Sequence, residues 1–259
     1  MMMTLCVITI LFTLLPLLLF ALNRGGYYKG NAKKYSVSRT QEMENSPLYG
    51  KTIIFLGSSV TYGSAAKGES FVEYMQKRDG IHSIKEAVCG TTLVDIGPKS
   101  YIARLKTIDK NIQADAFVCQ LPASDAHKRV PLGKISKSTE LSDFDTNTVT
   151  GAMEYIIAYA KETWGCPVIF HTGARYQYGG EYYDAMVNRL LRLQKKWNIG
   201  VLDLWNDRGM YIVTQEGQKL YMANNIQPTR AGYRDWWTPK FEAYLTHFLT
   251  PAGQGKFPG

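Results

Sequence analysis

The sequence predicts an α/β protein built as three layers, α/β/α, around a doubly wound, parallel, five-stranded sheet. Short apolar runs recur along the chain, and between them lie longer segments in which apolar residues have helical spacing. The run at 115–121 is almost unbroken in its apolar character, which is typical of a strand buried on both faces of a sheet. Single strands that alternate with helices favour a parallel sheet with crossover connections.

Five strands and five helices are expected in order along the chain. The strands are residues 52–56, 83–88, 115–121, 166–170 and 199–204. Helical spacing is found at 70–75, 101–108, 148–164, 181–197 and 229–249, and residues 130–147 are expected to form a polar loop. The last helix carries an aromatic stripe that predicts core packing rather than a cofactor site, namely Tyr233, Trp236, Trp237, Phe241, Tyr244 and Phe248.

The chain is expected to form one domain behind a separate N-terminal segment. Its 259 residues and 45% hydrophobic content suit a single core, which we place at residues 51–250, with a tail at 251–259. Residues 1–22 carry no charge and would span about 33 Å as a helix, enough for a bilayer core of about 30 Å. We interpret them as a single-pass membrane anchor, or an uncleaved signal, joined by a linker at 23–50. The side of the membrane stays open.

The charge and cysteine content narrow the class of partner. Thirty Lys and Arg against 22 Asp and Glu give a net charge of +8, but the basic residues are scattered rather than gathered in one run. This favours a solvated surface, or one that faces a membrane or cell wall, over nucleic-acid binding. The cysteines at 6, 89, 119 and 166 form no metal-binding pair, and no phosphate-binding loop is present. We therefore expect no metal and no cofactor.

A turn after the first strand carries the first candidate for chemistry. The run at 52–56 breaks at Gly57, Ser58 and Ser59 follow, and helical spacing then begins again. A strand, a sharp turn with a serine and a helix is how an α/β sheet presents a nucleophile at the carboxyl ends of its strands. The same three residues also suit an ordinary turn. Gly90, Ser124 and His171 each follow another strand and should lie at the same edge.

These segments together resemble the SGNH, or GDSL-type, hydrolases over residues 51–249. Gly57-Ser58-Ser59-Val60 stands where that family has Gly-Asp-Ser-Leu, and Gly90 matches its oxyanion-hole glycine. The resemblance implies a flavodoxin-like α/β/α fold, Ser59 as the nucleophile, and cleavage of a small acyl or acetyl ester or an acylated carbohydrate. Residues 221–237 match the block that opens the family's last helix.

Three catalytic positions of the family hold different residues here. Ser124 replaces the Asn that donates to the oxyanion, and Asn224 and Gln227 replace the Asp and His of the base pair. Because a glutamine amide does not titrate near neutral pH, Gln227 cannot accept the proton of Ser59. Two functions stay open: a serine ester hydrolase of very low activity, and an inactive relative that binds an acylated or carbohydrate ligand or a protein.

Nearby residues offer a replacement base or substrate contacts. His171 and His127 follow two strands and either act as a relocated base or are surface or hydrogen-bonded loop histidines. Arg175 and Tyr176 either hold a substrate carboxylate or sugar, or pack against the loop. Cys89 is expected to be a buried residue at a strand end rather than a nucleophile.

Overall fold

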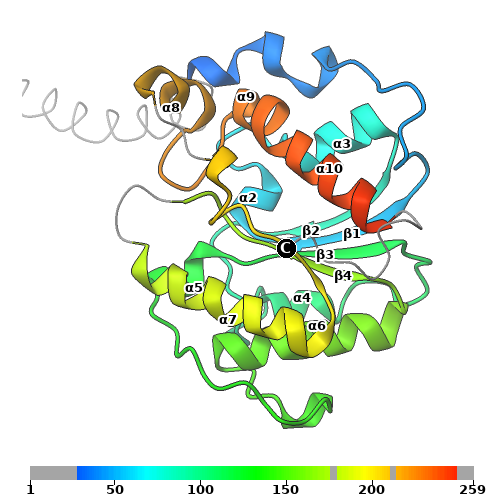
Figure 1. The fold of residues 1–259 in the computed structure, drawn as a ribbon, viewed down its shortest axis with the longest axis vertical. Coiled ribbons are helices and arrows are strands. Elements are labelled where there is room, and N and C mark those ends of the chain that lie inside the picture. Colours follow the sequence, from blue (N-terminus) through cyan, green and yellow to red (C-terminus); the bar gives the residue numbers. More distant parts are fainter. Residues whose placement is uncertain (1–27, 176–179, 211–213, 250–259) are drawn as a thin grey trace, which may run out of the picture.

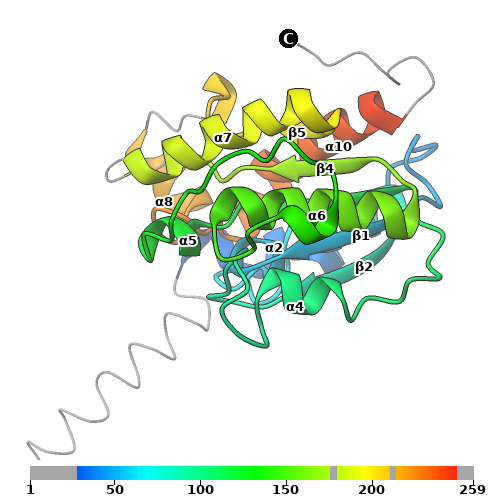
Figure 2. The ribbon, with the colours of Figure 1, turned by 90° about the horizontal axis from the view of Figure 1, so that it is seen from below.

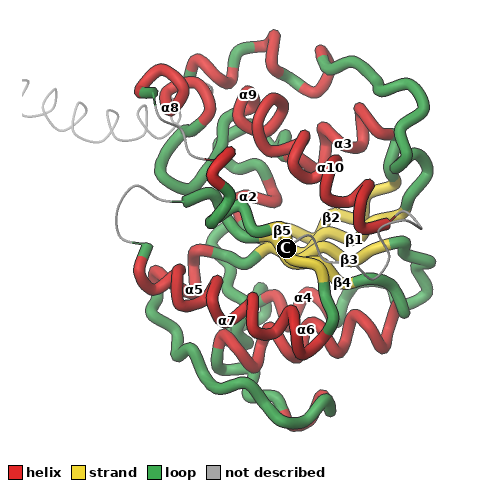
Figure 3. Tube along the Cα trace, viewed as in Figure 1, coloured by secondary structure: helices red, strands yellow, loops and turns green. Residues whose placement is uncertain are grey.

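A computed structural model describes residues 28–175, 180–210 and 214–249, and its centre is a five-stranded parallel sheet (Figure 3). The strands are β1 (Thr52–Gly57), β2 (His82–Ala87), β3 (Ala116–Gln120), β4 (Val168–His171) and β5 (Gly200–Leu202). Their order in the sheet is β2-β1-β3-β4-β5, and every neighbouring pair is parallel. The predicted fold class is confirmed.

Helices cover both faces of this sheet (Figures 1 and 2). One layer holds α4 (Tyr101–Leu105), α6 (Val149–Trp164) and α7 (Glu181–Trp197), and the other holds α3 (Phe71–Asp79) and α10 (Thr238–Leu249). Each layer packs its own apolar cluster against the strands. The aromatic stripe of the last helix lies in the second cluster, where Tyr233, Trp237 and Phe241 are buried. The stripe is therefore core, as predicted.

The long helices begin and end where their capping residues require. Ser70 and Glu73 form a reciprocal capping box at the start of α3, and the Thr148 hydroxyl accepts the Gly151 N–H at the start of α6. Gly80 and Gly165 end these two helices with positive φ angles of 69° and 60°. The predicted helices at 148–164 and 181–197 are thus reproduced almost to the residue.

Three short helices were not predicted, namely α2 (Ser59–Tyr62), α5 (Ala123–His127) and α8 (Gln215–Tyr221). All three are shorter than the window in which helical periodicity shows itself. The helix predicted at 229–249 is helical, but it is divided into α9 (Arg230–Gly232), a π-helical turn at Tyr233–Trp237 and α10. The π turn places the Tyr233 hydroxyl 2.7 Å from the Val60 carbonyl oxygen of α2.

Part of the segment predicted as a linker is folded against the domain. Residues 28–40, which we call the N-terminal strap, form three short 3-10 turns, Lys29–Asn31, Lys33–Tyr35 and Val37–Arg39. The Tyr74 hydroxyl of α3 donates to the Tyr35 carbonyl at 2.6 Å, and the Val37 N–H donates to Glu69 at 3.0 Å. Leu48, further along, is 1% exposed. The strap is part of the folded body.

The predicted anchor at 1–22 and the tail at 251–259 lie outside the described residues. Among the helices that the structure does describe, none combines the length and the apolar character needed to cross a membrane.

Candidate functional site

The carboxyl ends of the strands gather at one end of the molecule, where α2, α5 and α8 lie (Figures 1 and 2). Ser59 begins α2 directly after β1, Gly90 follows β2, and Ser124 lies in α5 after β3. The loop between α8 and α9 contributes Asn224 and Gln227. This is the edge where open α/β sheets bind ligands.

The Ser59 turn is fixed from below by Gln120, the last residue of β3. Its side-chain oxygen accepts hydrogen bonds from the Ser58 N–H at 3.0 Å and the Thr61 N–H at 3.1 Å, and its amide donates to the Ser58 hydroxyl at 3.1 Å. A Cβ at Gly57 would lie 2.1 Å from the Thr61 hydroxyl, so the turn requires glycine there. Ser59 is half-buried, and its hydroxyl has no hydrogen-bond partner among the described residues. The hydroxyl is therefore available to a substrate.

Gly90 is exposed in a turn just after β2. Its φ angle is 75°, a left-handed conformation that favours glycine, and a Cβ there would meet nothing within 4 Å. The open space above its backbone suits an N–H that faces a ligand. Cys89, expected to be buried, is exposed because it lies in this turn rather than at the strand end.

A buried arginine of α4 ties the Gly90 turn to β1. Arg104 is 6% exposed, and its guanidinium donates to the Gly57 carbonyl at 2.9 Å, to the Thr91 hydroxyl at 3.2 Å and to the Glu86 carbonyl at 2.9 Å. These acceptors flank the two candidate positions Ser59 and Gly90. The planar fork of arginine reaches all three, which a single lysine ammonium cannot do.

We expect Arg104→Lys to lower the rate at which a fluorophosphonate probe labels Ser59 by roughly tenfold to a hundredfold, because a displacement of about 1 Å has such an effect on a reacting group. The rate is measured above a Ser59→Ala background, with the melting temperature recorded alongside. Arg189→Lys is the matched control, since Arg189 also donates to a backbone carbonyl, that of Gly133, but does so from α7. Equal labelling rates in the two variants would contradict a positioning role for Arg104.

Ser124 and its neighbour Asp125 occupy α5. Ser124 is half-buried, and its hydroxyl has no hydrogen-bond partner among the described residues. Asp125 is 0% exposed and accepts hydrogen bonds from the N–H groups of Leu93 at 3.0 Å and Val94 at 3.5 Å. Burial raises the pKa of the Asp125 carboxyl to about 6. Asp125 thus anchors α5, the helix that carries Ser124, to the loop that follows Gly90.

Asn224 and Gln227, predicted as a pair, are brought together. The Asn224 side-chain oxygen accepts the N–H groups of Ile226 and Gln227, both at 2.9 Å. This fixes the Asn224 amide so that its NH₂ group donates, and it donates to the Gln227 side-chain oxygen at 3.1 Å. The Gln227 NH₂ group is left facing away from Asn224. An Asp-His pair would offer a hydrogen-bond acceptor, the imidazole nitrogen, at this position. The Asn224–Gln227 pair offers a donor instead.

His171 is excluded as a replacement base. It is 1% exposed and lies edge-on to the Phe71 and Phe241 rings, with centroid distances of 5.3 and 5.0 Å. Its Nδ1 bonds the Thr172 carbonyl at 3.2 Å. Burial lowers the pKa of His171 to about 4. His127 is exposed at the end of α5, at the site edge.

Arg175 is exposed, but its guanidinium is held against the protein surface. Its guanidinium donates to the Trp205 carbonyl at 3.2 Å and to Asn206 at 3.0 Å, and it lies 4.8 Å from the centre of the Trp205 ring. It also pairs with Asp184 at 3.3 Å. These contacts favour the packing alternative. Tyr176 lies outside the described residues.

Gln120, Arg104 and Asp125 hold the candidate site together, and sequence reasoning gave none of them a role. Gln120 offered a signal, since it is a polar residue at the end of an otherwise apolar run. Arg104 offered none, because a buried arginine in a short helix looks like any surface basic residue. The described residues contain no group of three His, Cys, Asp or Glu side chains arranged to hold a metal.

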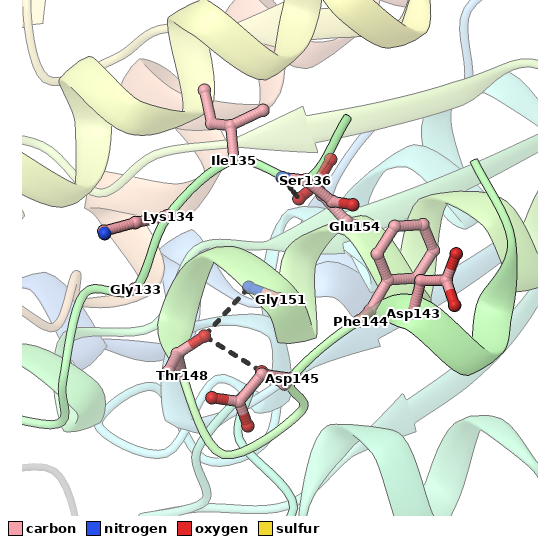
Figure 4. Close-up of a pocket in the computed structure, with 10 residues that line it drawn as sticks. All are labelled: Gly133, Lys134, Ile135, Ser136, Asp143, Phe144, Asp145, Thr148, Gly151 and Glu154. Atoms are coloured by element: carbon pink, nitrogen blue, oxygen red, sulfur yellow. Dashed lines mark hydrogen bonds between the residues drawn. The ribbon is translucent and has the colours of Figure 1, made fainter. Parts of the chain in front are cut away.

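A cavity of about 370 Å³ lies beside the first half of α6 (Figure 4). Its lining includes Lys134, Asp143, Asp145 and Glu154, and none of the predicted site residues that the structure describes. The Glu154 carboxylate is already used, because it accepts the Ser136 N–H at 2.9 Å and pairs with Lys196 at 2.6 Å. We therefore assign the cavity no part in the candidate chemistry.

Comparison with known proteins places the fold. No protein-family model and no curated protein sequence matches the chain. Among solved structures, a possible lipase from Chitinophaga pinensis DSM 2588 matches with a TM-score of 0.57 and 14% identity over 77% of this chain and 99% of that one. A protein described as a GDSL-like lipase from Bacteroides ovatus ATCC 8483 gives 0.55 and 15% over 76% and 98%.

A third match is a family two carbohydrate esterase from Clostridium thermocellum, solved in complex with cellohexaose. Its TM-score is 0.51 at 14% identity, over 81% of this chain and 66% of that one. The structure has the features that the sequence resemblance predicts. These are a parallel five-stranded sheet, a turn with a serine after β1 and a turn with a glycine after β2. The chain has the fold of the SGNH, or GDSL-type, hydrolases.

Proposed function

We propose that the protein is a serine ester hydrolase of low turnover that cleaves small acyl or acetyl esters through Ser59. The observation that carries the proposal is the Ser59 turn, in which a hydroxyl without a partner among the described residues is held over the buried Gln120 network. The Ser59 hydroxyl loses its proton as its oxygen attacks the ester carbonyl, and the Gly90 N–H, with Ser124, stabilises the oxyanion. The ester C–O bond then breaks, the alcohol leaves with a proton, and an acyl-serine remains. Water attacks the acyl-serine, which releases the carboxylic acid and restores the Ser59 hydroxyl.

The missing base sets the expected rate. Removing a catalytic histidine lowers turnover by about six orders of magnitude and leaves roughly a thousandfold over water, and losing an oxyanion donor costs about a hundredfold or more. With Gln227 presenting a donor and His171 buried, proton transfer from Ser59 must go to water or to His127. We therefore expect activated esters to be cleaved far faster than unactivated ones.

Ser59→Ala should abolish hydrolysis of 4-nitrophenyl acetate above the buffer rate. The substitution removes the attacking oxygen and changes no described hydrogen bond, so the fold should be retained. The measurement compares the purified full chain with the variant. Ser142→Ala, which removes an exposed hydroxyl in the loop before α6, is the control that leaves the proposed site unchanged. Equal rates for wild type and Ser59→Ala would reject the hydrolase.

The Asn224–Gln227 pair favours one alternative, a non-catalytic protein that binds an acylated or carbohydrate ligand, or a partner protein, at the same edge. A site lined by the Gln227 NH₂ group and the Gly90 N–H suits carbonyl or sugar oxygens, which accept hydrogen bonds. This alternative predicts that Ser59 is inert to a fluorophosphonate and that the chain still binds a probe such as cellohexaose. Calorimetric titration with cellohexaose tests it.

We also propose that residues 1–22 tether the protein to a membrane. The support is the sequence alone: this segment is uncharged and long enough to cross a bilayer. Flotation of the full chain with vesicles in a density gradient tests the proposal.

A further inference from the structure

The N-terminal strap packs directly beside the candidate site. A Cβ at Gly30 would lie 1.9 Å from the Leu220 carbonyl oxygen and 2.2 Å from the Thr229 hydroxyl, so the backbones are in close contact just after Gln227. Asn31 is 3% exposed, donates to the Ala65 carbonyl at 2.7 Å and accepts the Arg230 N–H at 2.9 Å. Ala65 belongs to the loop that follows α2. The strap therefore joins the loop that follows α2, the helix that begins at Ser59, to the segment that follows Gln227.

The position of the strap fixes which end of the domain lies next to the apolar segment. Only residues 23–27 separate that segment from Tyr28, and even fully extended they span at most about 20 Å. A domain of this size has a diameter of about 45 Å. If residues 1–22 lie in a bilayer, the end of the domain that carries the strap and the site must face it, and the opposite end cannot.

The charge of this face is consistent with that orientation. Lys29, Lys33, Lys34 and Arg39 of the strap are all exposed, and the strap contains no acidic residue. The turn Lys29–Asn31 packs against α8, where Lys219 is exposed together with one acid, Glu216. Clusters of basic residues close to a membrane segment are attracted to anionic lipid headgroups.

We propose that this basic face docks on an anionic lipid bilayer, so that the Ser59 site acts on esters presented at the membrane surface. The substrate part rests on the proposed hydrolase function, whereas the docking part does not. Because docking would hold the Ser59 site next to the bilayer, we expect the substrate to be an acyl ester held at the bilayer surface rather than one that diffuses freely.

Energy transfer from a dye to acceptor-labelled lipids tests the docking without any need for catalysis. The donor dye is placed on Cys89, which is exposed beside Gly90, in the full chain carrying Cys6→Ala. Cys119 and Cys166 are buried, and burial raises the pKa of both thiols, so they should not react. The reference donor is placed on a cysteine introduced by Asn111→Cys, in a chain that also carries Cys6→Ala and Cys89→Ser. Asn111 is exposed and precedes β3, so it lies at the amino ends of the strands, opposite the candidate site.

In proteoliposomes of phosphatidylcholine with phosphatidylglycerol, the Cys89 donor should transfer at least twice as efficiently as the Asn111 reference. Lys33→Glu with Lys34→Glu should reduce that difference, and the control pair Lys137→Glu with Lys195→Glu, exposed in the loop before α6 and on α7, should not. Equal transfer from the two positions, or a difference that charge reversal of the strap does not change, would overturn the docking.

The substrate is tested with one acyl ester in two forms, embedded in these vesicles and dissolved in buffer. Strap reversal should lower hydrolysis of the embedded form several-fold and leave the dissolved form unchanged. An equal loss on both forms would overturn the surface-substrate assignment. Hydrolysis of neither form above the Ser59→Ala rate would instead overturn the proposed function, while the energy-transfer result still decides the docking.

Discussion

Replacing Asn224 by Asp together with Gln227 by His should raise Ser59-dependent ester hydrolysis at least a hundredfold, since a missing triad histidine costs about a millionfold. The loop between α8 and α9 already has the hydrogen bonds that an Asp-His pair at positions 224 and 227 would use. A carboxylate introduced at position 224 keeps both backbone N–H donors that Asn224 Oδ1 now accepts at 2.9 Å, and its other oxygen meets the imidazole where the 3.1 Å amide contact now lies. The assay is initial-rate hydrolysis of 4-nitrophenyl acetate.

The single change Gln227→His is the sharpest control. Asn224 would still present its NH₂ group, because the two backbone donors hold its oxygen. An imidazole bonded to that donor must accept through Nδ1 and carry its proton on Nε2, which is the wrong tautomer to act as a base and lowers turnover by about four orders of magnitude in a serine protease. The double variant should therefore far exceed the single one. A folded double variant with no gain would contradict the pairing of this loop with Ser59.

The fold was predictable because its signals are local and redundant. The run at 115–121 is almost wholly apolar and became β3, and the helix predicted at 148–164 begins at a capping threonine and ends at a glycine. The strap was misread for the same reason. Its polar composition is typical of a linker, but its fold depends on contacts with partners far along the chain, as between Asn31 and Arg230, and no local pattern reports such contacts.

The candidate site was predictable only in its outline. Ser59, Gly90, Asn224 and Gln227 were found because each occupies a position that a family motif marks. The polarity of the Asn224–Gln227 pair required the structure, since it follows from two backbone donors that fix one amide. His171 was placed at the correct edge, but which face of β4 it occupies is decided by the aromatic rings of α3 and α10 that surround it.

Lowering the pH from about 6.5 to about 4 should cost the fold about 3 kcal/mol through His171 alone, at about 1.4 kcal/mol for each unit by which a pKa differs between states. Burial holds the pKa of His171 at about 4 in the folded state, so the unfolded chain binds a proton over this range and the folded chain does not. The resulting stability is complete above pH 6.5 and disappears as the pH falls through this window.

His171→Phe isolates this effect, because phenylalanine fills the aromatic site between Phe71 and Phe241 without titrating. The free energy of unfolding in urea should shift in favour of the variant by about 3 kcal/mol between pH 7 and pH 4, relative to wild type. The variant must be compared with wild type at each pH, because two buried carboxyl groups act in the opposite direction. Burial raises the pKa of Asp125 to about 6 and that of Glu242 to about 7, so both stabilise the fold as the pH falls. A constant difference between His171→Phe and wild type would show that His171 binds a proton as readily in the folded protein as in the unfolded chain, and would reopen its assignment as a base for Ser59.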